Sequence, residues 1–171
     1  MNIPNLLTLF RMFLIPIFIL IFFSNITNSF AYSIYIFFIA GFTDILDGYI
    51  ARKQNLITKW GTVLDPLADK LMLITVLSCL TLKNLIPSLI LIVVTIKEVA
   101  MIIAGVFLYN KNFIIPSNIF GKMSTLIFYL AILVLSFNIL YGRYILYLAV
   151  ISALVAFFNY LMLYIKKRDE A

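Results

Sequence analysis

Residues 30–52 read FAYSIYIFFIAGFTDILDGYIAR, a stretch in which no charged residue precedes Asp44. A run of this length and composition is typical of a helix that crosses a membrane, for which about 20 apolar residues suffice. The run ends with Asp44 and Asp47, whose spacing of three puts both acids on one helix face. Gly48 and Ala51 fall on the same face. The stretch therefore predicts a membrane helix with an acidic face near one end.

The rest of the chain has the same apolar character. Of its 171 residues, 64% are hydrophobic and 12% are charged, whereas soluble domains are about half apolar and a quarter charged. We expect an all-α, polytopic membrane protein formed by a single domain over residues 1–171. Its six expected transmembrane helices are residues 5–24, 30–52, 61–82, 85–109, 118–140 and 144–165. The turns between them are expected at residues 24–29, 53–59, 83–84, 110–117 and 141–143.

The basic residues predict an orientation. With six spans, the more basic connections and the tail fall on one side of the membrane, which the positive-inside rule makes cytoplasmic. The acidic end of the 30–52 helix then faces the cytoplasm, and a bacterial inner membrane is the expected location. The tail bases serve either topology alone or contact with anionic headgroups. The bases on this side are Arg52, Lys53, Lys59, Lys111, Lys166, Lys167 and Arg168.

The charge inventory excludes several kinds of chemistry. The chain has 13 Lys and Arg against 7 Asp and Glu, a net charge of +6, no His and one Cys, Cys79. It cannot form a disulfide within the chain or a His- or thiolate-ligated zinc site. Ser-His-Asp and Cys-His catalysis are excluded as well. A metal site must use oxygen ligands, which favours Mg, Mn or Ca.

Eight residues separate Arg52 from a second acidic segment. It runs from Gly61 to Asp69, and Gly61, Asp65 and Asp69 share one helix face by their spacing of four. A short connection makes the two helices antiparallel neighbours, so four aspartates are expected to converge. Four carboxylates near hydrocarbon repel one another unless cations balance them. Two divalent ions would match them.

Other interpretations of these residues stay open. Asp65 before Pro66 is also typical of a helix N-cap. Asp44 and Asp47 would also suit an ion network with Arg52 or Lys53. The small residues of the acidic faces would also let helices pack closely. An intramembrane carboxylate site would also suit a divalent-cation transporter, although no inverted repeat is evident. A helical scaffold without catalysis leaves the aligned aspartates unexplained.

The two segments together read D-x-x-D-G-x-x-A-R-x8-G-x-x-x-D-x-x-x-D without a gap. This pattern resembles the signature of the CDP-alcohol phosphotransferase family at every position. Residues 2–11, NIPNLLTLFR, and residues 64–70, LDPLADK, resemble segments of the family's bacterial phosphatidylglycerophosphate synthases. The six-helix layout is also similar, so the resemblance covers most of the chain.

The resemblance implies a reaction and its residues. CDP-diacylglycerol would pass its phosphatidyl group to an alcohol and release CMP. Two divalent ions, Mg or Mn, would be held by Asp44, Asp47, Asp65 and Asp69, and Asp69 would also be the general base. The residues implied for CDP binding are Asn5, Thr8, Arg11, Gly48, Ala51, Arg52 and Gly61, although Arg11 would also suit a plain interfacial base. A homodimer among membrane lipids is implied, and no nucleic-acid partner is expected.

The acceptor is expected to be glycerol 3-phosphate, an anion that needs a basic pocket. Candidate phosphate ligands are Lys97, Lys111 and Lys122. The similar synthases usually have arginine where Lys97 stands, and lysine does not reproduce the two-pronged contact of arginine. Cardiolipin synthesis, with phosphatidylglycerol as acceptor, therefore stays an alternative.

Overall fold

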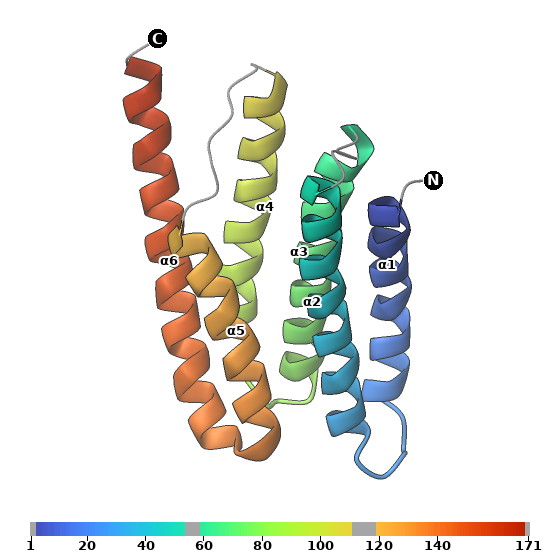
Figure 1. Ribbon diagram of the computed structural model, residues 1–171. Helices are drawn as coiled ribbons and strands as arrows, with labels where there is room; N and C mark the ends of the chain where they lie inside the picture. Colours follow the sequence, from blue (N-terminus) through green and yellow to red (C-terminus); the bar gives the residue numbers. More distant parts are fainter. Residues whose placement is uncertain (1–2, 54–58, 111–118, 170–171) are drawn as a thin grey trace. The chain divides into compact units, whose positions relative to one another are not determined.

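A computed structural model describes residues 3–53, 59–110 and 119–169, and every regular element in these ranges is an α-helix. The helices are α1 (Ile3–Phe22), α2 (Ser29–Lys53), α3 (Lys59–Leu82), α4 (Ser88–Asn110), α5 (Ile119–Phe137) and α6 (Ile139–Asp169) (Figure 1). The prediction of an all-α protein with six helices is confirmed for the described residues. The helices form two compact units, Met1–Leu85 and Ile86–Ala171, called unit 1 and unit 2 below.

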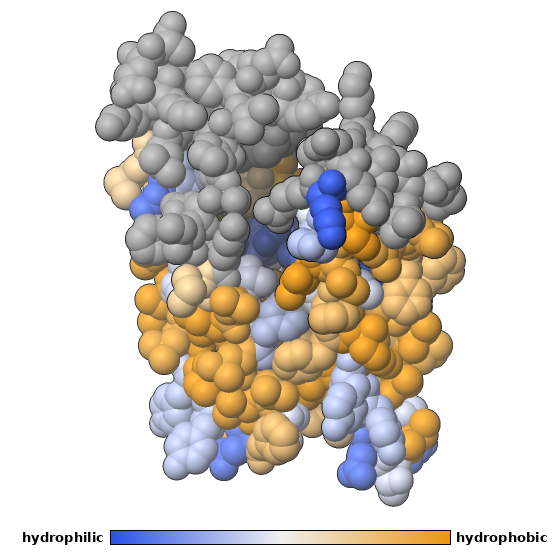
Figure 2. All heavy atoms as spheres, viewed as in Figure 1, coloured by the Kyte–Doolittle hydropathy of each residue, from blue (hydrophilic) through white to orange (hydrophobic). Residues whose placement is uncertain are grey.

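The described helices have the character of an integral membrane protein. Three stretches are long and apolar enough to cross a membrane: Asn5–Phe22, Ser29–Ile50 and Ile139–Met162. The apolar stretch Met123–Phe137 is shorter. Most of the described side chains seen along the helices in Figure 2 are apolar. Six crossings stay a prediction, because the described part of the chain supports three by length and composition.

In the first half of helix α1, polar side chains lie inside unit 1 and large apolar side chains lie outside. Thr8 and Arg11 are only 2% and 1% exposed, whereas Leu6 and Phe13 are 59% and 66% exposed. Apolar side chains that face water lose the stabilisation that burial would give, about 25 cal/mol per Å² of apolar surface. Apolar side chains that face lipid lose none of this stabilisation, because lipid tails are as apolar as a protein core. The pattern of α1 therefore fits a lipid surrounding and a polar interior.

Unit 1 is built around α1, which contacts both α2 and α3. The rings of Phe18 and Phe22 stack with their centroids 5.6 Å apart. Phe37 on α2 and Met72 and Leu77 on α3 are buried as well. The helices α1 and α2 run in opposite directions (Figure 1). Antiparallel packing sets the first half of α1 beside the second half of α2, where the aspartates lie.

The turn after α3 ends that helix, and its Lys83 side chain caps the end of α1. Asn84 has a positive φ of 56°, and the amide of Leu85 donates to the carbonyl of Leu80 over 2.9 Å, the pattern of a Schellman helix end. Lys83 Nζ donates to the carbonyl oxygen of Phe22, 2.7 Å away, at the end of α1. A cation at this position also complements the helix dipole. The turn predicted at residues 83–84 is confirmed.

In unit 2, α6 contacts both α4 and α5. The prediction of a turn at residues 141–143 is wrong, because α6 already begins at Ile139. The break between α5 and α6 is Asn138. Its side-chain oxygen accepts hydrogen bonds from the amides of Leu140 and Tyr141, at 3.0 and 3.2 Å. Asparagine is a preferred N-cap because it satisfies such free amides. Gly142 therefore lies inside α6.

Gly142 is required for close packing. A Cβ added there would lie 2.3 Å from the Cα of Leu135, on the backbone of α5. We expect Gly142→Ala to lower the free energy of unfolding by about 1–3 kcal/mol, the usual range for overpacking. Thermal unfolding in detergent measures the change. Gly121→Ala is the matched control, because nothing lies within 4 Å of a Cβ added there. Equal stability of the two variants would contradict the prediction.

Candidate active site

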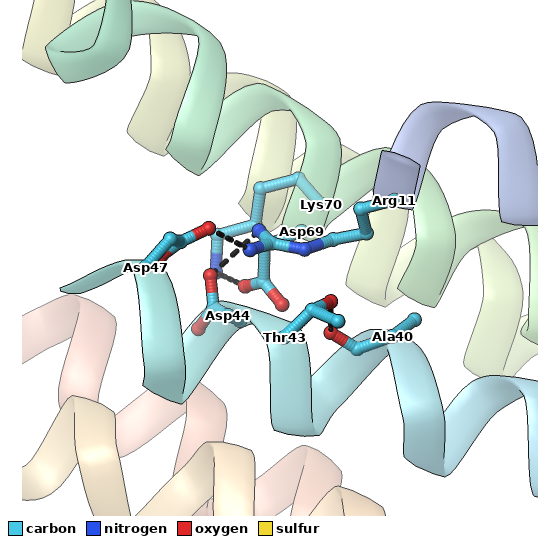
Figure 3. A network of polar contacts seen from close by, with 7 residues as sticks. All are labelled: Arg11, Ala40, Thr43, Asp44, Asp47, Asp69 and Lys70. Atoms are coloured by element: carbon cyan, nitrogen blue, oxygen red, sulfur yellow. Dashed lines mark hydrogen bonds and ion pairs between the residues drawn. The ribbon is translucent and has the colours of Figure 1, made fainter. Parts of the chain in front are cut away.

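The centre of the candidate site is an arginine between two aspartates. Arg11 on α1 donates from Nη1 to Asp44 Oδ1 over 2.6 Å, and from Nη2 to Asp47 Oδ2. Both acids lie on α2, one turn apart (Figure 3). The side chains of Arg11 and Asp47 are 1% and 3% exposed, whereas that of Asp44 is 41% exposed. The network therefore reaches from the interior of unit 1 to its surface.

Local sequence explains why these side chains meet. Asn5, Thr8 and Arg11 are three residues apart, so they share one face of α1. Thr8 and Arg11 on this face are buried. Thr43, next to Asp44, donates its hydroxyl to the carbonyl of Ala40 over 2.7 Å (Figure 3). That hydroxyl is satisfied within α2.

Helix α3 contributes Asp69, which forms an ion pair with its neighbour Lys70 at 3.9 Å. Both side chains are about a quarter exposed, and both appear with the Arg11 network in Figure 3. Asp65 lies inside α3, which begins at Lys59. The interpretation of Asp65 as an N-cap is therefore wrong. The side chain of Asp65 lies outside the described part.

The donor set fits Mg or Mn by its chemistry. The described side chains of the site offer three carboxylates, Asp44, Asp47 and Asp69, and no nitrogen or sulfur ligand. Hard divalent cations prefer such oxygen ligands. Among the described residues, no three acidic, His or Cys side chains are grouped closely enough to hold one ion. Arg11 engages one oxygen each of Asp44 and Asp47 instead, so a cation already lies where the carboxylates require one.

Other predicted donor-site residues are placed only in part. Gly48 lies on α2 after Asp47, and Asn5 lies on α1 one turn before Thr8. Both belong to unit 1 with the aspartates. The side chains of Ala51 and Arg52 and the surroundings of Gly61 lie outside the described part.

The predicted acceptor lysines belong to unit 2. Lys97 on α4 is 12% exposed, and its Nζ lies 2.7 Å from Glu98 Oε1. Glu98 is thus an ion-pair partner of Lys97. Lys111 lies outside the described residues, and so does the side chain of Lys122. Their role in acceptor binding stays a prediction.

Arg11 as the partner of Asp44 and Asp47 was not predicted. The ion network considered from the sequence used Arg52 or Lys53, but Lys53 Nζ lies 5.5 Å from the ring centroid of Tyr49. The sequence feature that could have indicated this partner is the row of polar residues Asn5, Thr8 and Arg11 on one face of α1. Three polar residues at helical spacing in a helix surrounded by lipid must face protein, because polar groups are costly against hydrocarbon.

The CDP-alcohol phosphatidyltransferase family matches residues 1–155 of this sequence. The chain belongs to this family. A protein of Wigglesworthia glossinidia brevipalpis is 35% identical over 181 aligned residues, covering 99% of this chain and 97% of its own length. One from Rickettsia bellii is 34% identical, covering 93% of each chain. One from Bacillus subtilis is 36% identical, covering 72% of this chain and 70% of its own length. All three are named CDP-diacylglycerol–glycerol-3-phosphate 3-phosphatidyltransferase.

Family membership decides between the functions considered for this chain. The resemblance drawn from the two acidic segments is confirmed over most of the chain. The family is one of transferases of phospholipid synthesis, so the transferase prediction replaces both the cation transporter and the scaffold. Arg11 contacts Asp44 and Asp47, two acids of the pattern from which the resemblance was drawn.

Proposed function

We propose that this protein transfers the phosphatidyl group of CDP-diacylglycerol to glycerol 3-phosphate, which gives phosphatidylglycerophosphate and CMP. The observation that carries the proposal is the similarity to relatives of that name over nearly their whole length, 97% and 93% for two of them. Similarity of that extent includes both units and all six helices. It favours glycerol 3-phosphate over phosphatidylglycerol as acceptor.

The chain's acidic residues suit the roles this reaction needs. We assign Asp44, Asp47, Asp65 and Asp69 as ligands of two Mg or Mn ions. Bound there, the ions would neutralise the diphosphate of the donor and the charge of the departing CMP. Asp69 would take the proton of the acceptor hydroxyl, and its partial exposure of 25% gives an acceptor access to it.

The remaining assignments are supported by the sequence. The CDP group would contact Asn5, Thr8, Arg11, Gly48, Ala51, Arg52 and Gly61. The acceptor phosphate would be bound by Lys97, Lys111 and Lys122. We place the site at the cytoplasmic face of a bacterial inner membrane, because the more basic connections lie on that side. We further propose that residues 1–171 act as one domain, since the family match crosses from unit 1 into unit 2. We also propose that the protein is a homodimer.

A panel of acceptors tests the function. Purified protein is mixed with CDP-diacylglycerol, Mg²⁺ or Mn²⁺, and one of glycerol 3-phosphate, phosphatidylglycerol, inositol phosphate or serine. We expect CMP release with glycerol 3-phosphate and none after the metal is chelated. The measurement is CMP by chromatography together with the lipid product by mass spectrometry.

The same panel identifies the alternative. CMP release with phosphatidylglycerol and not with glycerol 3-phosphate would establish the cardiolipin synthase reaction. No CMP release with any acceptor, from protein that is folded and loaded with metal, would refute the transferase proposal.

A further inference from the structure

Arg11 is a buried cation that joins two proposed metal ligands. Its side chain is 1% exposed, and its two terminal nitrogens contact one oxygen each of Asp44 and Asp47. Its Nε, also buried, has no hydrogen-bond partner among the described residues. An arginine frequently uses its fork on a single carboxylate in a two-pronged pair. Here the fork is divided between two carboxylates, and among the described residues Nε has no partner.

A guanidinium and a divalent ion would compete for these oxygens. Asp44 and Asp47 carry two negative charges and Arg11 one positive charge, so the trio keeps a net charge of −1. A divalent ion bound to the same two carboxylates would lie within a few ångströms of the guanidinium. Repulsion between two such cations is strong where water is scarce, because the effective dielectric constant is low. Arg11 therefore opposes metal binding while it stays in place.

We propose that Arg11 is the resident counter-ion of Asp44 and Asp47 in the metal-free protein, and that a divalent metal ion competes with it for these carboxylates. The inference rests on the proposed function, because it takes the two aspartates as metal ligands. Arg11 keeps the metal-free protein folded by balancing acids that would otherwise repel each other inside unit 1. It also lowers the affinity of the site for metal.

A different role for Arg11 makes the opposite prediction. If Arg11 only holds the two carboxylates in position, each could offer its second oxygen to the metal. Removing such a positioning residue typically weakens metal binding by about 10- to 100-fold. Removing a competing cation strengthens it. The sign of the change therefore separates the two roles.

The experiment measures Mn²⁺ affinity by calorimetry or by the spin resonance of free Mn²⁺ on full-length protein in detergent. We expect Arg11→Met to bind Mn²⁺ about 5- to 150-fold more tightly than the unaltered protein, the usual range for coupled ligands. Arg11→Lys keeps the charge and should stay near the unaltered affinity. Lys83→Met is the matched control, because Lys83 is a unit 1 cation that contacts the carbonyl of Phe22. Weaker binding by Arg11→Met overturns the inference.

A second measurement is made on the unaltered protein, and the conservative variant Arg11→Lys serves only to assign a signal. The chain has four arginines, Arg11, Arg52, Arg143 and Arg168, so ¹⁵N-arginine labelling gives few side-chain signals, and Arg11→Lys assigns one. Mg²⁺ should shift the Arg11 signal and speed rotation of its guanidinium. An unchanged Arg11 signal while Mg²⁺ binds overturns the inference and leaves the proposed function intact. An unaltered protein that binds neither ion removes the proposed metal site and this inference together.

Discussion

Replacing the last aspartate of the signature, Asp69→Asn, is expected to lower the rate of CMP release by at least about 100-fold, the low end of the contribution of a general base. The amide has nearly the same shape, but it cannot accept the proton of the acceptor hydroxyl. Asp69 is a quarter exposed and paired with Lys70 at 3.9 Å, so its loss leaves no deeply buried cation unpaired. We therefore expect activity to fall far more than stability.

Two comparisons make the Asp69 prediction specific. The first compares the rate of CMP release at low and at saturating Mn²⁺. If Asp69 were only a metal ligand, more Mn²⁺ would restore the rate, whereas the loss of a general base cannot be restored by metal. We expect the rate of Asp69→Asn to stay low at every Mn²⁺ concentration. The second is the variant Asp169→Asn, which changes an acid at the end of α6 that belongs to neither acidic segment and should keep its activity. Full CMP release from Asp69→Asn would remove Asp69 from the chemistry.

The sequence predicts those features that depend on local spacing. The six helices follow from the length of the apolar runs, and the shared face of Asp44 and Asp47 follows from their separation of three. The partner of these acids is not a local property. Arg11 lies 33 and 36 residues away from them, and only the packing of α1 on α2 brings it there. Spacing alone therefore favoured the nearer bases, Arg52 and Lys53.

The connection between α5 and α6 shows a different limit. Glycine in a polar tripeptide is a common turn signal because its backbone is unrestricted. At Gly142 the absence of a Cβ instead serves close contact with Leu135. Both uses of glycine look identical in a sequence. The decisive residue was Asn138, whose capping bonds to Leu140 and Tyr141 start α6 earlier than expected.

Asp47→Asn is expected to lower the free energy of unfolding of the metal-free protein by about 3 kcal/mol, the low end of the cost of breaking a buried ion pair. The oxygen of the substituted amide could still accept a hydrogen bond from Arg11, which keeps the cost low in that range. Asp44→Asn removes the same charge from a side chain that is 41% exposed, so its expected cost is about 1 kcal/mol or less. Chemical denaturation in detergent with a chelator measures both. Equal losses would contradict a role for burial.

A double variant separates the charge of Asp47 from its packing. Arg11→Met alone leaves two acids in mutual repulsion, and Asp47→Asn alone leaves Arg11 with a single, half-exposed partner. The double variant has neither fault, because only Asp44 keeps its charge and solvent reaches it. We therefore expect the double variant to lose less stability in chelator than the sum of the single losses. Additive losses would mean that Arg11 and Asp47 stabilise unit 1 by independent packing, and that the ion pair between them contributes nothing.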